Sequence, residues 1–332
     1  MHYATGGKSR LRSGVFLRSC LILLNVLGLC ACAITPIPRS SAESPVEELL
    51  KKRLERDVAF LTELVPSRSA ANVASLNKAA EYIAQEFTKT GCRLEEQHFP
   101  VEYGTYYRNI ICSFGPVEGE RVIVGAHYDV CCNLPGADDN ASGVAGILEL
   151  ARMVHREKPA LARRLDLVAY TLEEPPYFQR VVTRDSNMGS YHHAKYLADR
   201  KVPVKLMMSL EMIGYFNPKE YPDFPLNFLY PHEGAYIAVV GNWGQNYAIS
   251  RVSRLMAQEN TIDVVSMTAP TSMIDLSDHI NYWYFGYPAV MVTDTADYRN
   301  HNYHKDTDTI GTLDFTSMAG VVKGVYKVIM DY

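Results

Sequence analysis

The sequence lacks the local motifs that identify the commonest enzyme classes. It has no His-Glu-x-x-His helix, no Walker phosphate-binding loop, no Gly-rich dinucleotide fingerprint and no Gly-x-Ser-x-Gly elbow. These absences exclude the commonest competing enzyme classes.

The chain also lacks a strong charge of either sign. Its net charge is −4 at pH 7, and it has neither a long basic run nor basic residues interleaved with aromatic ones, so nucleic acid is not expected as a partner. No apolar stretch of about 18 or more residues follows the N-terminal segment, so no membrane span is expected after processing. Internal repeats and low-complexity segments are absent as well.

Residues 1–33 have the pattern of a secretory signal peptide. The apolar run 21–29 is too short to span a bilayer comfortably, and it follows a basic region that contains Lys8, Arg10, Arg12 and Arg18. The Ala31-Cys32-Ala33 spacing would allow cleavage after Ala33. However, residues 29–32 also resemble a bacterial lipobox, which would leave Cys32 as the lipidated first residue. Both alternatives predict export, either to the periplasm or as a membrane-anchored lipoprotein of the cell envelope.

After a Pro- and Ser-rich tether at residues 34–45, residues 46–332 are long enough for one large α/β domain. We expect a three-layer αβα sandwich around a mixed, mostly parallel sheet. Residues 93–101 and 106–114 read as a hairpin at the antiparallel edge of that sheet. Amphipathic spacing and helix-ending residues predict the main helices at residues 46–64, 75–88, 188–200, 244–259 and 313–330.

The most informative stretch is Val122–Gly143. Its apolar start, residues 122–124, reads as a strand buried on both faces. His127 and Asp129 follow the strand, then the pair Asp138-Asp139, and then a helix that Asn140 and Ser142 can cap. In open α/β sheets ligands bind beyond the carboxyl ends of strands, so these side chains lie where a site is expected.

Three later apolar runs end in the same way. Residues 165–172 lead into Glu173 and Glu174, residues 204–210 lead into Glu211, and residues 288–292 lead into a polar loop that reaches His304. Carboxylates that converge on one sheet edge repel each other unless a cation is present. A mixed set of His and carboxylate ligands suits zinc better than magnesium or calcium.

Four cysteines follow the N-terminal segment. In an oxidising compartment, Cys92 and Cys112 can form a bridge across the predicted hairpin. Cys131 and Cys132 flank the predicted site; because adjacent cysteines rarely share a metal, we expect a vicinal disulfide or two free thiols.

These segments together resemble the zinc-dependent M28 peptidases, which are exopeptidases of the aminopeptidase type. The resemblance extends from about residue 79 to the C-terminus, and its blocks occur in the order of the family. The blocks are Gly125-Ala-His-Tyr-Asp129, Pro135-Gly-Ala-Asp-Asp-Asn-Ala-Ser-Gly143, Glu173-Glu174 with Gly189-Ser190, Leu210-Glu-Met-Ile-Gly214, and Tyr303-His304 with Asp308-Thr309.

The resemblance implies a peptide hydrolase with two zinc ions. His127 and Glu211 would hold one ion, Glu174 and His304 would hold the other, and Asp138 would bridge both. Glu173 would be the general base. Asp129 would fix the ring of His127 through its far nitrogen.

Two departures leave alternatives open. The family commonly has Asp where this chain has Glu211, but Glu-Met-Ile-Gly is otherwise intact, so Glu211 is kept as a ligand. The spacing does not decide between Asp138 and Asp139; the resemblance selects the first. The loop after Glu174 also resembles that of the glutaminyl cyclases, single-zinc acyltransferases of the same fold that would use Asp138, Glu174 and His304 alone. A protein that kept the fold and lost activity is the third alternative.

Overall fold

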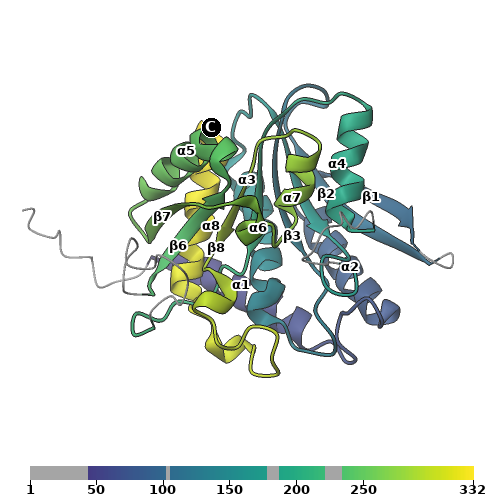
Figure 1. The fold of residues 1–332 in the computed structure, drawn as a ribbon, viewed down its shortest axis with the longest axis vertical. Helices are drawn as coiled ribbons and strands as arrows, with labels where there is room; N and C mark the ends of the chain where they lie inside the picture. Colours follow the sequence, from purple (N-terminus) through teal and green to yellow (C-terminus); the bar gives the residue numbers. More distant parts are fainter. Residues whose placement is uncertain (1–43, 102–104, 178–186, 221–233) are drawn as a thin grey trace, which may run out of the picture. The chain divides into compact units, whose positions relative to one another are not determined.

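The computed structural model describes residues 44–101, 105–177, 187–220 and 234–332, which belong to one compact unit, Ser44–Tyr332 (Figure 1). The predicted signal peptide, the alternative lipid anchor at Cys32 and nearly all of the tether lie outside the described residues. Within the described part of the chain, every helix is too short or too polar to cross a membrane.

The described strands form one eight-stranded sheet with the order β1-β2-β4-β3-β5-β8-β6-β7. The four central strands, β4, β3, β5 and β8, are parallel to each other, and the β1–β2 hairpin is antiparallel at one edge. At the other edge β6 runs antiparallel to β8 and parallel to β7. The strands are β1 Arg93–Pro100, β2 Tyr106–Phe114, β3 Arg121–His127, β4 Arg164–Tyr170, β5 Val204–Glu211, β6 Tyr236–Gly241, β7 Asp263–Thr268 and β8 Ala289–Thr293.

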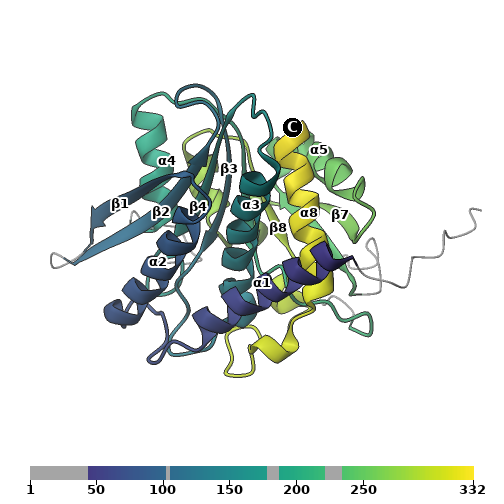
Figure 2. The same ribbon diagram turned by 180° about the vertical axis from the view of Figure 1, so that it is seen from behind.

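Helices cover both faces of the sheet, which confirms the predicted three-layer sandwich (Figures 1 and 2). Side chains of β3 alternate between the two layers: Val122 and Val124 pack into one apolar core and Ile123 into the other. The larger core contains helices α1 Pro45–Thr62, α2 Val73–Thr88, α3 Gly143–Glu157, α5 Asn246–Ala257 and α8 Phe315–Asp331. The opposite face is covered by α4 Gly189–Asp199, α6 Thr271–Ile274 and α7 His279–Tyr284.

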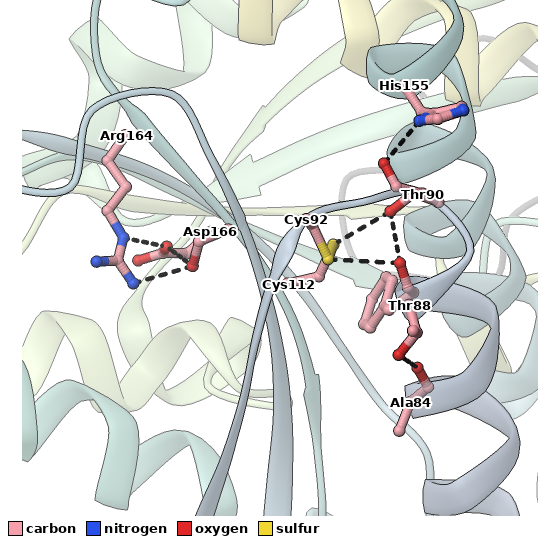
Figure 3. Close-up of a disulfide and its surroundings, with 10 residues drawn as sticks. Ala84, Thr88, Thr90, Cys92, Cys112, His155, Arg164 and Asp166 are labelled. Atoms are coloured by element: carbon pink, nitrogen blue, oxygen red, sulfur yellow. Dashed lines mark hydrogen bonds and ion pairs between the residues drawn. A yellow bond between two sulfur atoms is a disulfide. The ribbon is translucent and has the colours of Figure 1, made fainter.

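A disulfide joins Cys92, just after the C-terminal end of α2, to Cys112 on β2, as the sequence predicted (Figure 3). Thr90 lies beside it, with its Oγ1 3.8 Å from Cys112 Sγ and its carbonyl oxygen 2.7 Å from Nδ1 of His155 on α3. The bridge therefore fastens the end of α2 to the hairpin edge of the sheet.

Replacing both Cys92 and Cys112 by Ala is expected to lower the free energy of unfolding by about 3 kcal/mol, because the bridge closes a loop of 20 residues in the unfolded chain. Urea unfolding under non-reducing conditions measures the difference. A reductant should destabilise the parent and leave the double variant unchanged. Equal unfolding midpoints for parent and variant would contradict the assignment.

Candidate metal centre

The predicted site residues meet at the carboxyl ends of the parallel strands. His127 is the last residue of β3 and Glu211 is the last residue of β5. Glu173 and Glu174 follow β4, and His304 lies in the loops that follow β8. Strands that are neighbours in the sheet thus bring residues from distant parts of the sequence into one cleft.

Asp139 lies between the two imidazoles. Its Oδ1 is 3.3 Å from Nε2 of His127, and its Oδ2 is 3.1 Å from Nε2 of His304. Glu211 Oε2 is 3.4 Å from His127 Nε2, and Glu174 Oε2 is 3.2 Å from His304 Nε2. The side chains therefore form two neighbouring donor clusters that share one carboxylate.

The expectation that Asp138 bridges the two clusters does not hold in the structure. The carboxylate of Asp138 accepts hydrogen bonds from the backbone N–H of Gly214 at 2.9 Å and from Nδ2 of Asn300 at 2.7 Å. Asp308 accepts the backbone N–H groups of both Asp138 and Asp139, at 2.9 Å and 3.1 Å. This clamp on the backbone presents Asp139 to the imidazoles, while Asp138 is held by the segments behind it.

Asp129 connects the glutamate pair to His127. Its two carboxylate oxygens accept the backbone N–H groups of Glu173 at 3.1 Å and Glu174 at 3.0 Å. Its Oδ1 is also 3.6 Å from Nδ1 of His127, on the far side of the ring from Asp139. Glu173 points into the cleft, with Oε2 3.8 Å from His127 Nε2. Asp129 and Glu173 thus lie beside different nitrogens of the His127 ring, Asp129 near Nδ1 and Glu173 near Nε2.

A serine from the segment just before α7 holds the carboxylate of Glu211. Ser277, just before α7, donates a hydrogen bond from Oγ to Glu211 Oε2 at 2.6 Å, and Oγ of Ser209 on β5 lies 3.1 Å from Oγ of Ser277. This hydrogen bond fixes the position of the Glu211 carboxylate. The sequence did not predict this partner, since Ser277 lies 66 residues from Glu211 in the chain.

The site concentrates negative charge in a buried place. Burial and, to a smaller extent, the adjacent carboxylate of Asp139 raise the pKa of Glu174 to about 7. Burial also raises the pKa of Glu173 well above its ordinary value. Burial alone would raise the pKa of Asp139 as well, but the imidazoles of His127 and His304 outweigh it and hold that pKa below its ordinary value. Cations are needed to stabilise so many carboxylates.

The donor set fits zinc. Nε2 of His304 is buried and lies within 3.2 Å of two carboxylate oxygens, yet it has no partner in hydrogen-bond geometry. A nitrogen aimed between carboxylates in this way is placed as a ligand for a shared ion. Imidazole with carboxylate is a zinc-type donor set, whereas magnesium and calcium prefer oxygen ligands alone.

Two cavities meet at the site. The first has a volume of about 290 Å³, and its lining residues are Asp139, Glu173, Glu174, Pro175, Glu211, Leu276, Asp297, Tyr303 and His304. The second, of about 410 Å³, is largely apolar and shares Glu211, Leu276, Asp297 and Tyr303 with the first. Its apolar lining residues include Val240, Trp243, Met267, Met273, Ile274 and Met291. The charged cleft therefore adjoins an apolar pocket, with which it shares lining residues.

Comparison with known proteins agrees with this geometry. The chain is 43% identical over 292 residues to the protein YfbL of Escherichia coli (strain K12), covering 84% of this chain and 87% of that one. It is 28% identical over 290 residues to a probable leucine aminopeptidase of Arthroderma otae, covering 82% of this chain and 70% of the relative.

Solved structures share the fold at low identity. A leucine aminopeptidase precursor from Bacteroides thetaiotaomicron superposes with a TM-score of 0.65 at 18% identity, covering 85% of this chain and 97% of that one. A glutaminyl cyclase from Porphyromonas gingivalis superposes with a TM-score of 0.66 at 20% identity, covering 84% of this chain and 97% of that one. The model of peptidase family M28 matches residues 109–329, which include every donor residue of the two clusters. The chain therefore belongs to peptidase family M28, and it is a peptide hydrolase.

Proposed function

We propose that the protein is a zinc-dependent aminopeptidase that removes N-terminal residues from peptides. The observation that carries this proposal is the position of Asp139, whose two oxygens face two different imidazoles. One carboxylate shared by two clusters is the arrangement that a pair of metal ions requires. Homology to leucine aminopeptidases supports the same activity.

In this proposal His127 and Glu211 hold one zinc ion, Glu174 and His304 hold the other, and Asp139 is shared. The ions, when bound, would polarise the scissile carbonyl group and lower the pKa of a coordinated water. Asp129 keeps the His127 ring oriented, since its backbone carbonyl oxygen lies 3.2 Å from Nδ1 and its Oδ1 lies 3.6 Å away, and the far nitrogen of a liganding imidazole needs a hydrogen-bond partner.

Glu173 is the general base in this proposal. Its carboxylate is buried and reaches into the cleft beside His127. It accepts a proton from the attacking water and passes that proton to the amine that leaves when the peptide bond breaks. Because the backbone N–H groups of Glu173 and Glu174 bond to the same Asp129 carboxylate, the base and the ligand beside it keep a fixed spacing.

The two cavities suit a substrate with one residue before the scissile bond. An apolar side chain fits the pocket of about 410 Å³, and its wall of Met, Ile and Trp side chains favours large apolar residues. Asp297 is exposed at the junction of the two cavities, where the α-ammonium group of such a residue would lie. We propose that Asp297 binds this group.

Replacing Asp297 by Asn is expected to raise KM for aminoacyl substrates about 10-fold with little change in kcat, because the change removes one charge partner of the ammonium group. Steady-state kinetics on leucyl- and methionyl-coumarin measure both constants. Asp306→Asn, at another exposed loop carboxylate, is the matched control. An unchanged KM in the Asp297 variant would contradict the assignment.

A panel of aminoacyl-coumarin substrates tests the activity directly. We expect turnover of large apolar residues with a free amino group, none after N-acetylation, loss of turnover with a chelator, and recovery on addition of zinc. Turnover that a chelator leaves unchanged would refute the metal mechanism.

The glutaminyl cyclases remain the competing hypothesis, because their solved structures share the fold. A single-zinc cyclase would leave the cluster of His127 and Glu211 without an ion. The zinc content of the purified protein separates the two: about two ions per chain support the peptidase. One ion, together with release of ammonia from peptides with N-terminal Gln, supports the cyclase.

We also propose that the enzyme works outside the bacterial cytoplasm, in the periplasm or anchored to the envelope. The signal-like residues 1–33 support this, and the Cys92–Cys112 disulfide suits an oxidising compartment. Identification of the N-terminal residue of the mature protein, and of any lipid attached to it, would distinguish lipidation at Cys32 from cleavage after Ala33.

A further inference from the structure

A cysteine lies next to one of the two clusters. Sγ of Cys131, a nitrogen of His304 and a carboxylate oxygen of Glu174 all lie within 4.8 Å of one another. The side chain of Cys131 is buried, and the residue is only 7% exposed. The thiol therefore belongs to the cluster itself and not to the surface of the cleft.

Glu174 fixes this arrangement through both carboxylate oxygens. Its Oε1 accepts the backbone N–H of Cys131 at 3.0 Å, and its Oε2 is 3.2 Å from Nε2 of His304. Cys131 is thus attached to the residue whose other oxygen faces the imidazole. A single carboxylate therefore contacts both the backbone of Cys131 and the imidazole of His304.

We propose that Cys131 supplies a thiolate ligand to the zinc position of Glu174 and His304. The proposal relies on the zinc site of the proposed function, and it departs from the sequence-based expectation that neither cysteine binds metal. A sulfur, a nitrogen and carboxylate oxygens form a donor set typical of zinc. On binding, the thiol proton is released to solvent, and the thiolate forms the bond to zinc.

This ligand makes the two zinc positions unequal. Cys131, Glu174, His304 and Asp139 are four protein donors, which would fill a tetrahedral zinc position. The other position has three, His127, Glu211 and Asp139, and so keeps one place open. Glu173 lies on the side of that open position, with Oε2 3.8 Å from His127 Nε2. The base therefore faces the position that can take a water.

Cys132 provides a matched control. Its Sγ is 3.0 Å from that of Cys131, yet the residue is exposed and does not belong to the donor cluster. The two cysteines are adjacent in sequence and differ in their access to the site. Cys132→Ser removes one thiol, as Cys131→Ser does, but it removes no donor of the cluster.

Cobalt substitution of the full-length protein tests the proposal without an activity assay. Metal-free protein, treated with a phosphine reductant, is titrated with Co²⁺ while near-ultraviolet absorption is recorded. A thiolate bound to cobalt gives a charge-transfer band there that carboxylate and imidazole ligands do not give. We expect the band in the parent and in Cys132→Ser, and we expect its loss in Cys131→Ser.

A chelator competition gives the second readout. Cys131→Ser is expected to weaken one of two zinc equivalents by at least about 100-fold, since removal of a ligand's hydrogen-bond partner alone costs about 10- to 100-fold. A band that persists in Cys131→Ser would overturn the proposal, as would a band absent from the fully loaded parent. Recovery of Cys131 and Cys132 as a disulfide from zinc-loaded protein would also overturn it.

The outcomes separate this proposal from the proposed function. A protein that shows the thiolate band and hydrolyses no aminoacyl substrate would refute the aminopeptidase and keep the ligand. A protein that hydrolyses such substrates in a zinc-dependent manner and lacks the band would support the aminopeptidase and refute Cys131 as a ligand.

Discussion

Replacing Glu173 by Gln is expected to lower kcat/KM for aminoacyl-coumarin substrates by about 100- to 10,000-fold, the contribution of a positioned general base. The amide has nearly the same shape as the carboxylate but cannot accept the proton of the attacking water. The zinc content should stay unchanged, because Glu173 belongs to neither donor cluster. Steady-state kinetics with metal analysis on the same preparation measure both quantities.

Two control variants make this result specific. Glu174→Gln removes a donor from the His304 cluster, so it should lower zinc content together with activity. Glu118→Gln, at an exposed position remote in sequence from the site, should change neither. Full activity in a zinc-replete Glu173→Gln variant would show that another group moves the proton.

The sequence predicted most of the site because parallel strands align their carboxyl ends. His127 and Glu211 end β3 and β5, which are neighbours in the sheet, so the strand pattern alone brings them together. The Glu pair after β4 follows the same rule. A position that depends only on where a strand ends can be read from local periodicity.

Contacts from distant segments decide the parts of the site that local sequence patterns do not predict. The choice between Asp138 and Asp139 depends on Gly214, Asn300 and Asp308, which lie between 76 and 170 residues further along the chain. No local spacing encodes such a choice. The bond from Ser277 to Glu211 was missed for the same reason.

Strands β6 and β7 were not predicted. Strand β6 is a fully buried apolar run, whose length alone does not separate a short strand from a helix segment. Strand β7 is at the edge of the sheet and is mostly exposed or half-buried, so its pattern is weak. Neither strand ends in a donor residue, although β6 and β7 contribute Val240 and Met267 to the apolar pocket.

The identity of the shared carboxylate gives the largest expected contrast between neighbouring residues. Asp139→Asn removes the charge that faces both His127 and His304, so both zinc equivalents should be lost. In the proposed function the two ions would supply several kcal/mol of transition-state stabilisation, and each 1.4 kcal/mol is tenfold in rate, so kcat/KM should fall by about 1,000-fold or more. Zinc analysis after dialysis and steady-state kinetics measure the two losses.

Asp138→Asn is the matched comparison, because it makes the same carboxylate-to-amide change at the adjacent residue. Asp138 bonds to Gly214 and Asn300, so its replacement should lower the free energy of unfolding by about 1–3 kcal/mol through a disturbed buried hydrogen-bond network. Zinc content should remain near that of the parent at a temperature where the variant is folded. If instead Asp138→Asn released both ions and Asp139→Asn kept them, the shared ligand would be Asp138. Because the two variants carry the same substitution at adjacent positions, their metal contents decide between the two aspartates independently of any assumption about the substrate.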